Sequence, residues 1–426
     1  MVGGTIAAPS SKSHMQRVIA AGTMAAGVTR LEYETTCADS EAALRVAASL
    51  GAEVWRDRNA IEITGARGFM DSFGSAGSAG VSADRQDGEL LLSCGESGLC
   101  MRMFAPIAAL LGRTVVMEAS GSLRERPMRM IEEVLPEFGV AVQTDEGSAP
   151  IRLSGRLHGG SLCMDARESS QLLTGLLMAL PLTSPKSLLS VYNAASRGYL
   201  DLTMAVCGKF GINISKNKSY SQFSIPGGQH YSAADIAVEG DWSAGAFLIV
   251  MGAVAGAPGG LTIVGLDTES EQPDRAIVEA ARRAGAKIGV ETRTITVKKD
   301  RLKAFKFDAT DCPDLFPPLV VLATACPGRS SIKGVHRLRG KESDRAETLS
   351  AMTTALGGAA WIEDDSLIVE ARALTGGRVD PQNDHRIAMA AETASLLCAG
   401  GVTIADSECV GKSWPGFFDA IDTIRC

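Results

Sequence analysis

The densest set of chemically active side chains lies in residues 334–345, GVHRLRGKESDR. Its cations are Arg337, Arg339, Lys341, Arg345 and, when protonated, His336; its carboxylates are Glu342 and Asp344. A helical pattern, AETLSAMTTALGG, follows directly, and free N–H groups at a helix start favour anions. Taken alone, such a run is most often a solvated surface loop. Its meaning therefore depends on the rest of the chain.

Three other stretches carry a basic residue beside an expected helix start. They are APSSKSHMQR (residues 8–17), LRERP (residues 123–127) and NDHRIAMA (residues 383–390). Several helix starts of this kind in one chain predict a substrate with more than one phosphate or carboxylate group.

Composition places these clusters in an ordinary globular protein. The chain has 426 residues, 45% hydrophobic and 21% charged, which is enough for two domains with their own cores. The net charge of −7 argues against a nucleic-acid partner. We therefore expect local sites for small anions.

Cysteine and histidine usage indicates neither disulfides nor a metal. The ten cysteines show no CxxC or zinc spacing, which predicts reduced, mostly buried thiols in a cytosolic protein. The histidines are dispersed, and neither a signal peptide nor a membrane anchor is expected. Residues 242–266 lack charges, but the break at residues 256–260 predicts a buried helix followed by a buried strand.

A repeat runs through the chain at intervals of roughly 70 to 85 residues. Each copy has an apolar helix, a Gly or Pro break, a short β-branched strand, an amphipathic helix that tends to end in Gly, and an alternating strand pair. The sixth copy stops at the chain end before its strand pair. We predict an α/β fold of βαβαββ units, three in each of two domains, although ordinary α/β alternation is the simpler alternative.

The first helix of each unit is apolar nearly all round and should be buried within its domain. Polar residues gather at its start: Ser13, Ser97, Ser169, Asp241, Asp314 and Asp384. Some of these are expected to be N-caps, Asp384 among them.

Nine motifs give the chain a specific resemblance over essentially its full length: SKSHMQR, GESGLCMR, RERP, ESSQLLTGLL, SRGYLDLT, CPDLFP, RGKESDR, NDHRIAM and GKSWPGF. In this order they resemble the 5-enolpyruvylshikimate-3-phosphate (EPSP) synthase family of enolpyruvyl transferases. The resemblance implies an inside-out α/β barrel architecture with two hinge strands. We expect a shikimate 3-phosphate domain at residues 11–237. Residues 1–10 and 238–426 should form the domain with the phosphoenolpyruvate cations and catalytic carboxylates.

Family roles carry over by position. Contacts with shikimate 3-phosphate correspond to Lys12, Ser13, Arg17, Ser169, Ser170, Gln171, Ser196, Tyr199, Asp314 and Lys341. Contacts with phosphoenolpyruvate correspond to Lys12, Gly98, Arg126, Gln171, Arg345, Arg386 and Lys412. Asp314 corresponds to the proton acceptor, Glu342 to a carboxylate implicated in proton transfer, and Lys12 to a lysine between both substrates. The resemblance implies transfer of an enolpyruvyl group to the 5-hydroxyl of shikimate 3-phosphate by a cytoplasmic monomer, without cofactor, metal, nucleic acid or membrane.

The residue types suit this chemistry. The guanidinium group of arginine can donate two parallel hydrogen bonds to a phosphate or a carboxylate. Lysine instead carries a single charge on a flexible side chain, and its pKa shifts readily. Two positions depart from the family pattern. Glu96 should repel an anion unless it pairs with a cation or points away, and Arg337 stands where some members have Asn. His385 is expected either to assist proton transfer or to orient a neighbour.

Three alternatives stay open. An enolpyruvyl transferase for UDP-N-acetylglucosamine shares fold and donor but uses a loop cysteine, and GSLRERP at residues 121–127 has none. A non-enzymatic anion binder would not need both Asp314 and Glu342. An RNA phosphate cyclase shares the repeat but has no use for the ESSQ and SRGY stretches.

Overall fold

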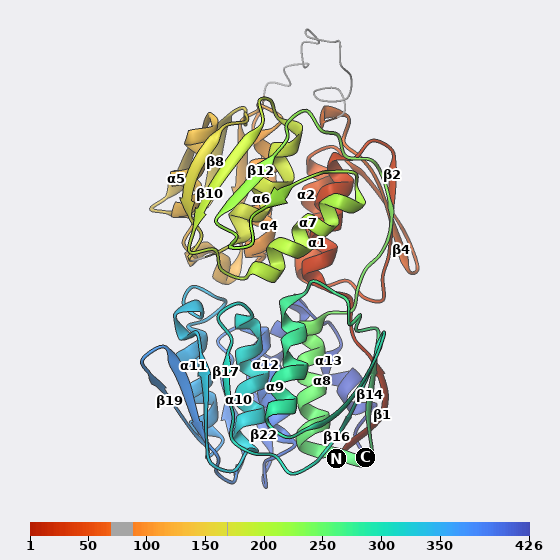
Figure 1. Cartoon of the computed structure of the whole chain (residues 1–426), viewed down its shortest axis with the longest axis vertical. Helices are drawn as coiled ribbons and strands as arrows, with labels where there is room; N and C mark the ends of the chain where they lie inside the picture. Colours follow the sequence, from red (N-terminus) through yellow and green to blue (C-terminus); the bar gives the residue numbers. More distant parts are fainter. Residues whose placement is uncertain (70–87, 168) are drawn as a thin grey trace. The chain divides into compact units, whose positions relative to one another are not determined.

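The computed structural model describes residues 1–69, 88–167 and 169–426, so Glu168 of the ESSQ stretch lies outside the described residues. The chain divides into two compact units (Figure 1). One combines Met1–Ser11 with Glu239–Cys426 and is called the carboxylate unit below; the other is Lys12–Val238, called the serine unit. Each unit has its own hydrophobic core.

The limits of the two units differ from the expected domain limits at two residues, Ser11 and Val238. Ser11 belongs to the carboxylate unit, because its N–H donates to Glu239 O at 2.7 Å and its Oγ to Gln272 Oε1 at 3.0 Å. Val238 belongs to the serine unit, where its N–H donates to Glu32 O at 2.8 Å. Which substrate each unit binds stays a prediction.

The serine unit contains three four-stranded sheets, ordered β13-β2-β4-β3, β5-β6-β8-β7 and β11-β12-β10-β9. Its strands are β2 (Val28–Glu32), β3 (Glu53–Asp57), β4 (Ala60–Thr64), β5 (Leu90–Ser93), β6 (Val115–Glu118), β7 (Val140–Asp145), β8 (Ser148–Gly155), β9 (Ser161–Asp165), β10 (Ser187–Tyr192), β11 (Ser215–Lys216), β12 (Gln222–Ile225) and β13 (Asp235–Ala237). Its helices are α1 (Lys12–Met24), α2 (Ala38–Ser49), α4 (Gly98–Ala109), α5 (Arg129–Val134), α6 (Gln171–Ala179) and α7 (Arg197–Lys209). Each sheet has one parallel pair at one edge, such as β5 with β6, and two antiparallel pairs.

The carboxylate unit repeats this plan in the sheets β1-β14-β16-β15 and β17-β18-β20-β19. Its strands are β1 (Val2–Ala7), β14 (Gly256–Val264), β15 (Lys287–Glu291), β16 (Thr294–Lys298), β17 (Lys306–Asp308), β18 (Arg329–Lys333), β19 (Ala359–Glu363), β20 (Ser366–Glu370), β21 (Gly377–Val379) and β22 (Val402–Ile404). Its helices are α8 (Trp242–Ala255), α9 (Ile277–Arg283), α10 (Phe316–Thr324), α11 (Arg345–Ala355), α12 (His385–Ser395) and α13 (Phe417–Asp422). The last sheet is only the parallel pair β21-β22, as expected for a copy that stops early.

The chain ends of each unit complete its first repeat. In the serine unit, β13 pairs in parallel with β2, although the two strands lie at opposite ends of that unit's sequence. In the carboxylate unit, β1 pairs in parallel with β14. The two crossings between units follow closely on strands β1 and β13. The β1–β14 pair therefore forms only after both crossings, whereas β2 and β13 lie within the one continuous segment of the serine unit.

The first helix of each repeat is buried, as its composition predicts. Every residue of α8 is buried, and the apolar run ends at Gly256, where β14 begins. In Figure 1, α8, α10 and α12 lie in the interior of their unit, between its sheets. None of the helices in the described part of the chain is long and apolar enough to cross a membrane.

Local capping explains where several of these helices start and stop. Ser97, Asp241 and Asp384 are N-caps whose side chains accept from Cys100 N, Ala244 N and Arg386 N. The second helix of each complete repeat is followed by a glycine with positive φ, a conformation that glycine adopts at little steric cost. These glycines are Gly51, Gly139, Gly211, Gly285 and Gly357.

Candidate active site

The guanidinium of Arg345 is the centre of a buried ionic network in the carboxylate unit. Its Nε donates to Asp384 Oδ2 at 2.9 Å, its Nη1 to Asp314 Oδ1 at 2.8 Å and its Nη2 to Glu342 Oε2 at 2.6 Å. Arg345 begins α11, Asp384 caps α12 and Asp314 precedes α10, so three helix starts converge here. Burial lowers the pKa of Arg345, but the charges of Asp384, Glu342 and Asp314 outweigh it and raise the value overall. The guanidinium therefore stays charged although fully buried.

Asp314 is surrounded by cations. Its Oδ2 accepts from Arg386 Nη2 at 3.1 Å, and its Oδ1 lies 3.6 Å from Lys341 Nζ in addition to the Arg345 contact. Burial alone would raise the pKa of Asp314 and Glu342 adds to that effect, but Arg386, Lys341 and Arg345 together bring it well below its ordinary value. Asp314 is therefore an ionised carboxylate whose basicity depends on how strongly these cations act on it.

The remaining expected cations of this unit lie around the same network. Burial lowers the pKa of Lys341 despite the opposing charge of Asp314. Burial lowers the pKa of Arg386, but the charges of Asp314, Asp274 and Asp241 together outweigh it and raise the value overall. Lys412 is buried and donates from Nζ to Asn383 O at 2.8 Å, in the loop before α12. The unit thus holds both predicted carboxylates and four predicted cations.

In the serine unit, Arg17 is a buried cation held by neutral groups. Its Nε donates to Thr203 Oγ1 at 2.9 Å and its Nη1 to Ser13 O at 2.7 Å, and the Tyr199 ring centroid lies 5.7 Å from its Cζ. No carboxylate pairs with it among the described residues, and burial lowers its pKa to about 10. A buried arginine held only by neutral groups suits an external anion.

Lys12, the first residue of α1, is paired. Its Nζ lies 3.1 Å from Asp39 Oδ2, and both side chains are mostly buried. Asp39 belongs to the first turn of α2. The contact with Asp39 therefore orients the lysine.

The start of α6 presents Ser169, Ser170 and Gln171. Ser169 Oγ accepts from Gln171 N at 3.1 Å, Ser170 is buried, and Gln171 Oε1 accepts from Arg102 Nη1 at 2.7 Å. Ser196 is the N-cap residue of α7 and has a φ of 53°, in the left-handed region; its carbonyl accepts from Tyr199 N at 3.0 Å. Such a backbone is unusual for serine and is typical of functional sites.

Gly98 has no room for a side chain. A Cβ there would lie 2.8 Å from Arg102 Nη1 and 2.9 Å from Arg126 Nη1. Two guanidinium groups therefore gather over the first residue of α4, where helix N–H groups also favour an anion.

Every predicted site residue is among those described, and they divide between the two units. The serine unit contains Lys12, Ser13, Arg17, Gly98, Arg126, Ser169, Ser170, Gln171, Ser196 and Tyr199. The carboxylate unit contains Asp314, Lys341, Glu342, Arg345, Arg386 and Lys412.

Sequence reasoning missed two residues that hold these groups, Asp39 and Arg102. It also missed that Asp384, expected as a cap, binds Arg345. Arg102 had a usable signal, because it lies one helical turn after Gly98 and so on the same face of α4. The partnerships of Asp39 with Lys12 and of Asp384 with Arg345 join separate elements and left no sequence pattern.

The structure shows what surrounds Glu96 and Arg337, the two residues that depart from the family pattern. Glu96 points to the segment that carries Arg126, where its Oε2 accepts from Ser122 N at 3.1 Å. Arg337 is buried, and burial lowers its pKa against the opposing charges of Asp311 and Asp314.

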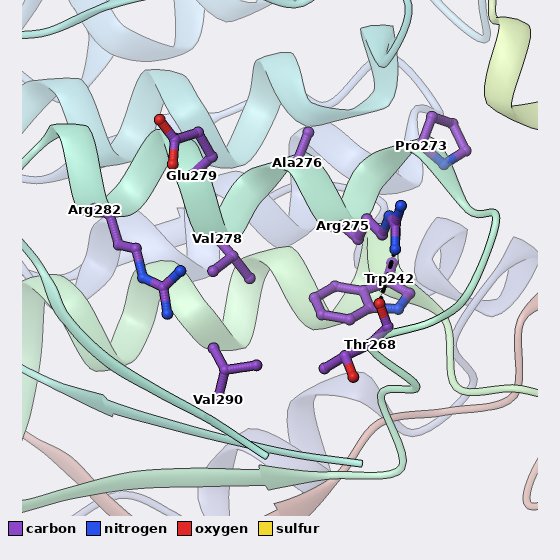
Figure 2. Close-up of a pocket in the computed structure, with 9 residues that line it drawn as sticks. All are labelled: Trp242, Thr268, Pro273, Arg275, Ala276, Val278, Glu279, Arg282 and Val290. Atoms are coloured by element: carbon purple, nitrogen blue, oxygen red, sulfur yellow. Dashed lines mark hydrogen bonds between the residues drawn. The ribbon is translucent and has the colours of Figure 1, made fainter. Parts of the chain in front are cut away.

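A separate cavity of about 350 Å³ in the carboxylate unit involves none of the predicted residues (Figure 2). Trp242, Val278 and Val290 line it, with Arg275 and Arg282 also facing it. Arg275 Nη1 donates to Thr268 O at 2.8 Å, and Trp242 Nε1 donates to Asp267 O at 2.8 Å. Its polar donors thus serve the local backbone, and the candidate site remains the two groups above.

Comparison with solved structures defines the class of protein. The EPSP synthase of Acinetobacter baumannii matches with a TM-score of 0.79 and 23% identity, over 99% of this chain and 96% of that chain. The enolpyruvyl transferase NikO of Streptomyces tendae matches with a TM-score of 0.75 and 16% identity, over 99% and 95%. The fold is therefore that of the enolpyruvyl transferases, and the predicted α/β class is confirmed.

Sequence comparison is more specific. Residues 1–421 match the family model described as EPSP synthase (3-phosphoshikimate 1-carboxyvinyltransferase). Proteins named 3-phosphoshikimate 1-carboxyvinyltransferase are similar throughout: that of Clostridium kluyveri is 33% identical over 98% of this chain and 93% of its own length, and that of Methanoculleus marisnigri 34% over 97% and 95%. The chain belongs to the EPSP synthase family, which confirms the resemblance found in its motifs.

Proposed function

We propose that the protein transfers the enolpyruvyl group of phosphoenolpyruvate to the 5-hydroxyl of shikimate 3-phosphate, giving EPSP and phosphate, in aromatic amino-acid (chorismate) biosynthesis. The observation that carries this proposal is Asp314, an ionised carboxylate held among Arg345, Arg386 and Lys341 in a chain of this family. A base among cations suits deprotonation of a hydroxyl on a substrate that brings its own negative charge.

The reaction follows an addition and an elimination. The substrate hydroxyl oxygen forms a bond to C2 of phosphoenolpyruvate while Asp314 accepts the hydroxyl proton. Glu342 delivers a proton to the methylene carbon, which becomes a methyl group. The C–O bond to phosphate then breaks, and the methyl group returns a proton to the Glu342 carboxylate, so the double bond is restored and phosphate leaves with the bonding electron pair.

Bound substrate anions would change the pKa of Asp314. Asp314 owes its low pKa to Arg386, Lys341 and Arg345. Bound phosphate and carboxylate groups would offset part of that positive charge, so we expect the pKa of Asp314 to rise towards its ordinary range in the loaded enzyme. The carboxylate would then be a stronger base when its substrate is present.

The binding roles are proposed by unit. In the serine unit, Arg17, Ser196 and the start of α6 at Ser169, Ser170 and Gln171 would bind shikimate 3-phosphate. This is supported by a buried Arg17 without an acidic partner among the described residues. Arg126 over Gly98 would bind phosphoenolpyruvate, as would Arg345, Arg386 and Lys412 in the carboxylate unit. Lys12 would contact both substrates. We also propose that the protein acts as a monomer in the cytoplasm and needs neither a metal nor a cofactor.

The deciding experiment is phosphate release from phosphoenolpyruvate with shikimate 3-phosphate as acceptor, beside UDP-N-acetylglucosamine. We expect release only with shikimate 3-phosphate, and loss of release in Asp314→Asn. Release only with the sugar nucleotide would overturn the proposal. Binding of both ligands without turnover would favour the non-enzymatic alternative.

A further inference from the structure

The carboxylate of Glu96 lies against the segment that carries Arg126. Its Oε2 accepts from Ser122 N at 3.1 Å and from Ser122 Oγ at 3.2 Å. The Glu96 carboxylate also lies close to the preceding residue, where a side chain would displace it. A Cβ on Gly121, whose φ is 49°, would lie 2.3 Å from the Glu96 carboxyl carbon.

Backbone hydrogen bonds join the same two segments. Cys94 N donates to Glu118 O at 2.9 Å, and Ser120 N donates to Gly95 O at 2.8 Å. The loop between β5 and α4 is thus paired to the start of residues 119–127. Glu96 extends this pairing by one further, side-chain contact.

The other end of the segment is fixed by a residue of the helix that follows this loop. Arg102, in α4, donates from Nη2 to Pro127 O at 3.0 Å. Arg126 lies between these two attachments, with its Nη1 close to the position that a Cβ on Gly98 would occupy. The Arg126 segment is therefore held at both ends, by the Glu96 carboxylate from the loop before α4 and by the Arg102 guanidinium from α4 itself.

We propose that Glu96 is a positioning residue for Arg126: by binding Ser122 it holds the Arg126 guanidinium over Gly98, where it receives phosphoenolpyruvate. The inference rests on the proposed role of Arg126 in binding that substrate. It also explains how an acid occurs two residues before an anion site. The carboxylate is directed to two donors of Ser122, and charge-assisted hydrogen bonds of this kind are stronger than neutral ones.

The direction in which Glu96→Gln changes the KM for phosphoenolpyruvate distinguishes a positioning role from simple charge repulsion. Glu96→Gln removes a negative charge near the anion site, so repulsion alone predicts a lower KM for phosphoenolpyruvate. Positioning predicts the opposite, a KM raised on the order of tenfold, because a neutral amide is a weaker acceptor for Ser122. Glu96→Asp keeps the charge but is one methylene shorter, so it should also raise this KM. The KM for shikimate 3-phosphate should stay within about twofold of the wild-type value, since its contacts lie elsewhere.

Glu125→Gln is the matched control, because it removes the same charge from an exposed residue next to Arg126. We expect its KM for phosphoenolpyruvate to stay near that of the wild type. Ser122→Ala should raise this KM in the wild-type background and much less in the Glu96→Gln background, because both changes remove the same contact. Fully additive effects of the two changes would contradict the proposal.

Hydrogen exchange tests the contact without turnover. In Glu96→Gln, amide exchange in residues 118–127 should be faster than in the wild type and in Glu125→Gln. If the wild-type protein releases no phosphate from the two substrates, the proposed function fails, and the exchange measurement still decides whether Glu96 anchors the segment. If the wild type turns over but Glu96→Gln lowers the KM for phosphoenolpyruvate or leaves exchange unchanged, the positioning role is overturned.

Discussion

Arg345 and Asp384 form a fully buried ion pair in which Nε donates to Oδ2 at 2.9 Å and Nη2 to Oδ1 at 3.3 Å. Asp384 also caps α12 through Arg386 N, so one carboxylate fixes both a helix start and the central arginine. Arg345 in turn contacts Asp314 and Glu342. The geometry of both proposed proton-transfer groups therefore depends on this pair.

Asp384→Ala should be strongly destabilising. It leaves a buried arginine with one fewer counter-charge, and breaking a buried pair typically costs about 3–5 kcal/mol. The free energy of unfolding in urea measures this cost. Glu363→Ala is the control, because it breaks an exposed pair with Arg329 and should cost at most about 1 kcal/mol. Equal losses in the two variants would show that Arg345 does not depend on Asp384.

Asp314 should make stability depend on pH. Its pKa is depressed in the folded protein, so its ionised form contributes stability above the unfolded value of about 3.9, and this contribution is lost as pH falls towards the folded pKa. The difference in unfolding free energy between wild type and Asp314→Asn should thus be constant near neutral pH and shrink below about pH 4. Urea titrations at a series of pH values test this. A gap that widens on acidification would mean that the pKa is raised.

Gly98→Ala should weaken phosphoenolpyruvate binding without unfolding the protein. The new Cβ would lie within 3 Å of Arg102 Nη1 and Arg126 Nη1; these are the far ends of long side chains, so they can be displaced without moving the backbone. A raised KM for phosphoenolpyruvate with a nearly unchanged melting temperature is expected. Gly208→Ala, at a helical position in α7 with nothing within 4 Å of the Cβ, should change neither. An unaltered KM in Gly98→Ala would place the substrate away from these arginines.

Lys12→Met should nearly abolish turnover while the protein stays folded. The change removes the charge that pairs with Asp39 but keeps much of the apolar stem. Steady-state phosphate release and circular dichroism provide the two measurements. Lys287→Met removes a lysine from an exposed pair with Asp300 and should remain active. Activity of Lys12→Met within a few-fold of wild type would move Lys12 out of the reaction.

Glu342→Gln tests the source of the methylene proton. The amide keeps a hydrogen bond to Arg345 but cannot supply a proton, and a general acid typically contributes about 10²–10⁴-fold to rate. In deuterated water the wild type should incorporate deuterium into the enolpyruvyl methylene group. Exchange at the wild-type rate in Glu342→Gln would assign the proton to another residue, with Lys12, Lys412 or Asp314 next to test. Glu347→Gln, an exposed change in the first turn of α11, is the control.

Features that depend on neighbours in the chain were open to prediction. Helical and alternating periodicity placed the repeats, and the caps at Ser97, Asp241 and Asp384 follow from hydrogen bonds over two or three residues. The glycine-rich break after α8 also appeared in the sequence, because a single residue type changes the local backbone. The motifs then indicated the family, since nine short patterns in one order are far more specific than any of them alone.

Only the tertiary structure decided which charges face each other. Arg345 and Asp384 lie 39 residues apart, and Lys12 and Asp39 lie 27 apart. Nothing local encodes such a pairing, because it depends on how helix starts converge once the sheets have formed. The same reason explains Ser11 and Val238, whose unit is set by hydrogen bonds to distant backbone, and Glu96, which sequence reasoning left without a role. Side-chain type is a property of the sequence, but the partner that shifts its pKa or fixes its direction is a property of the fold.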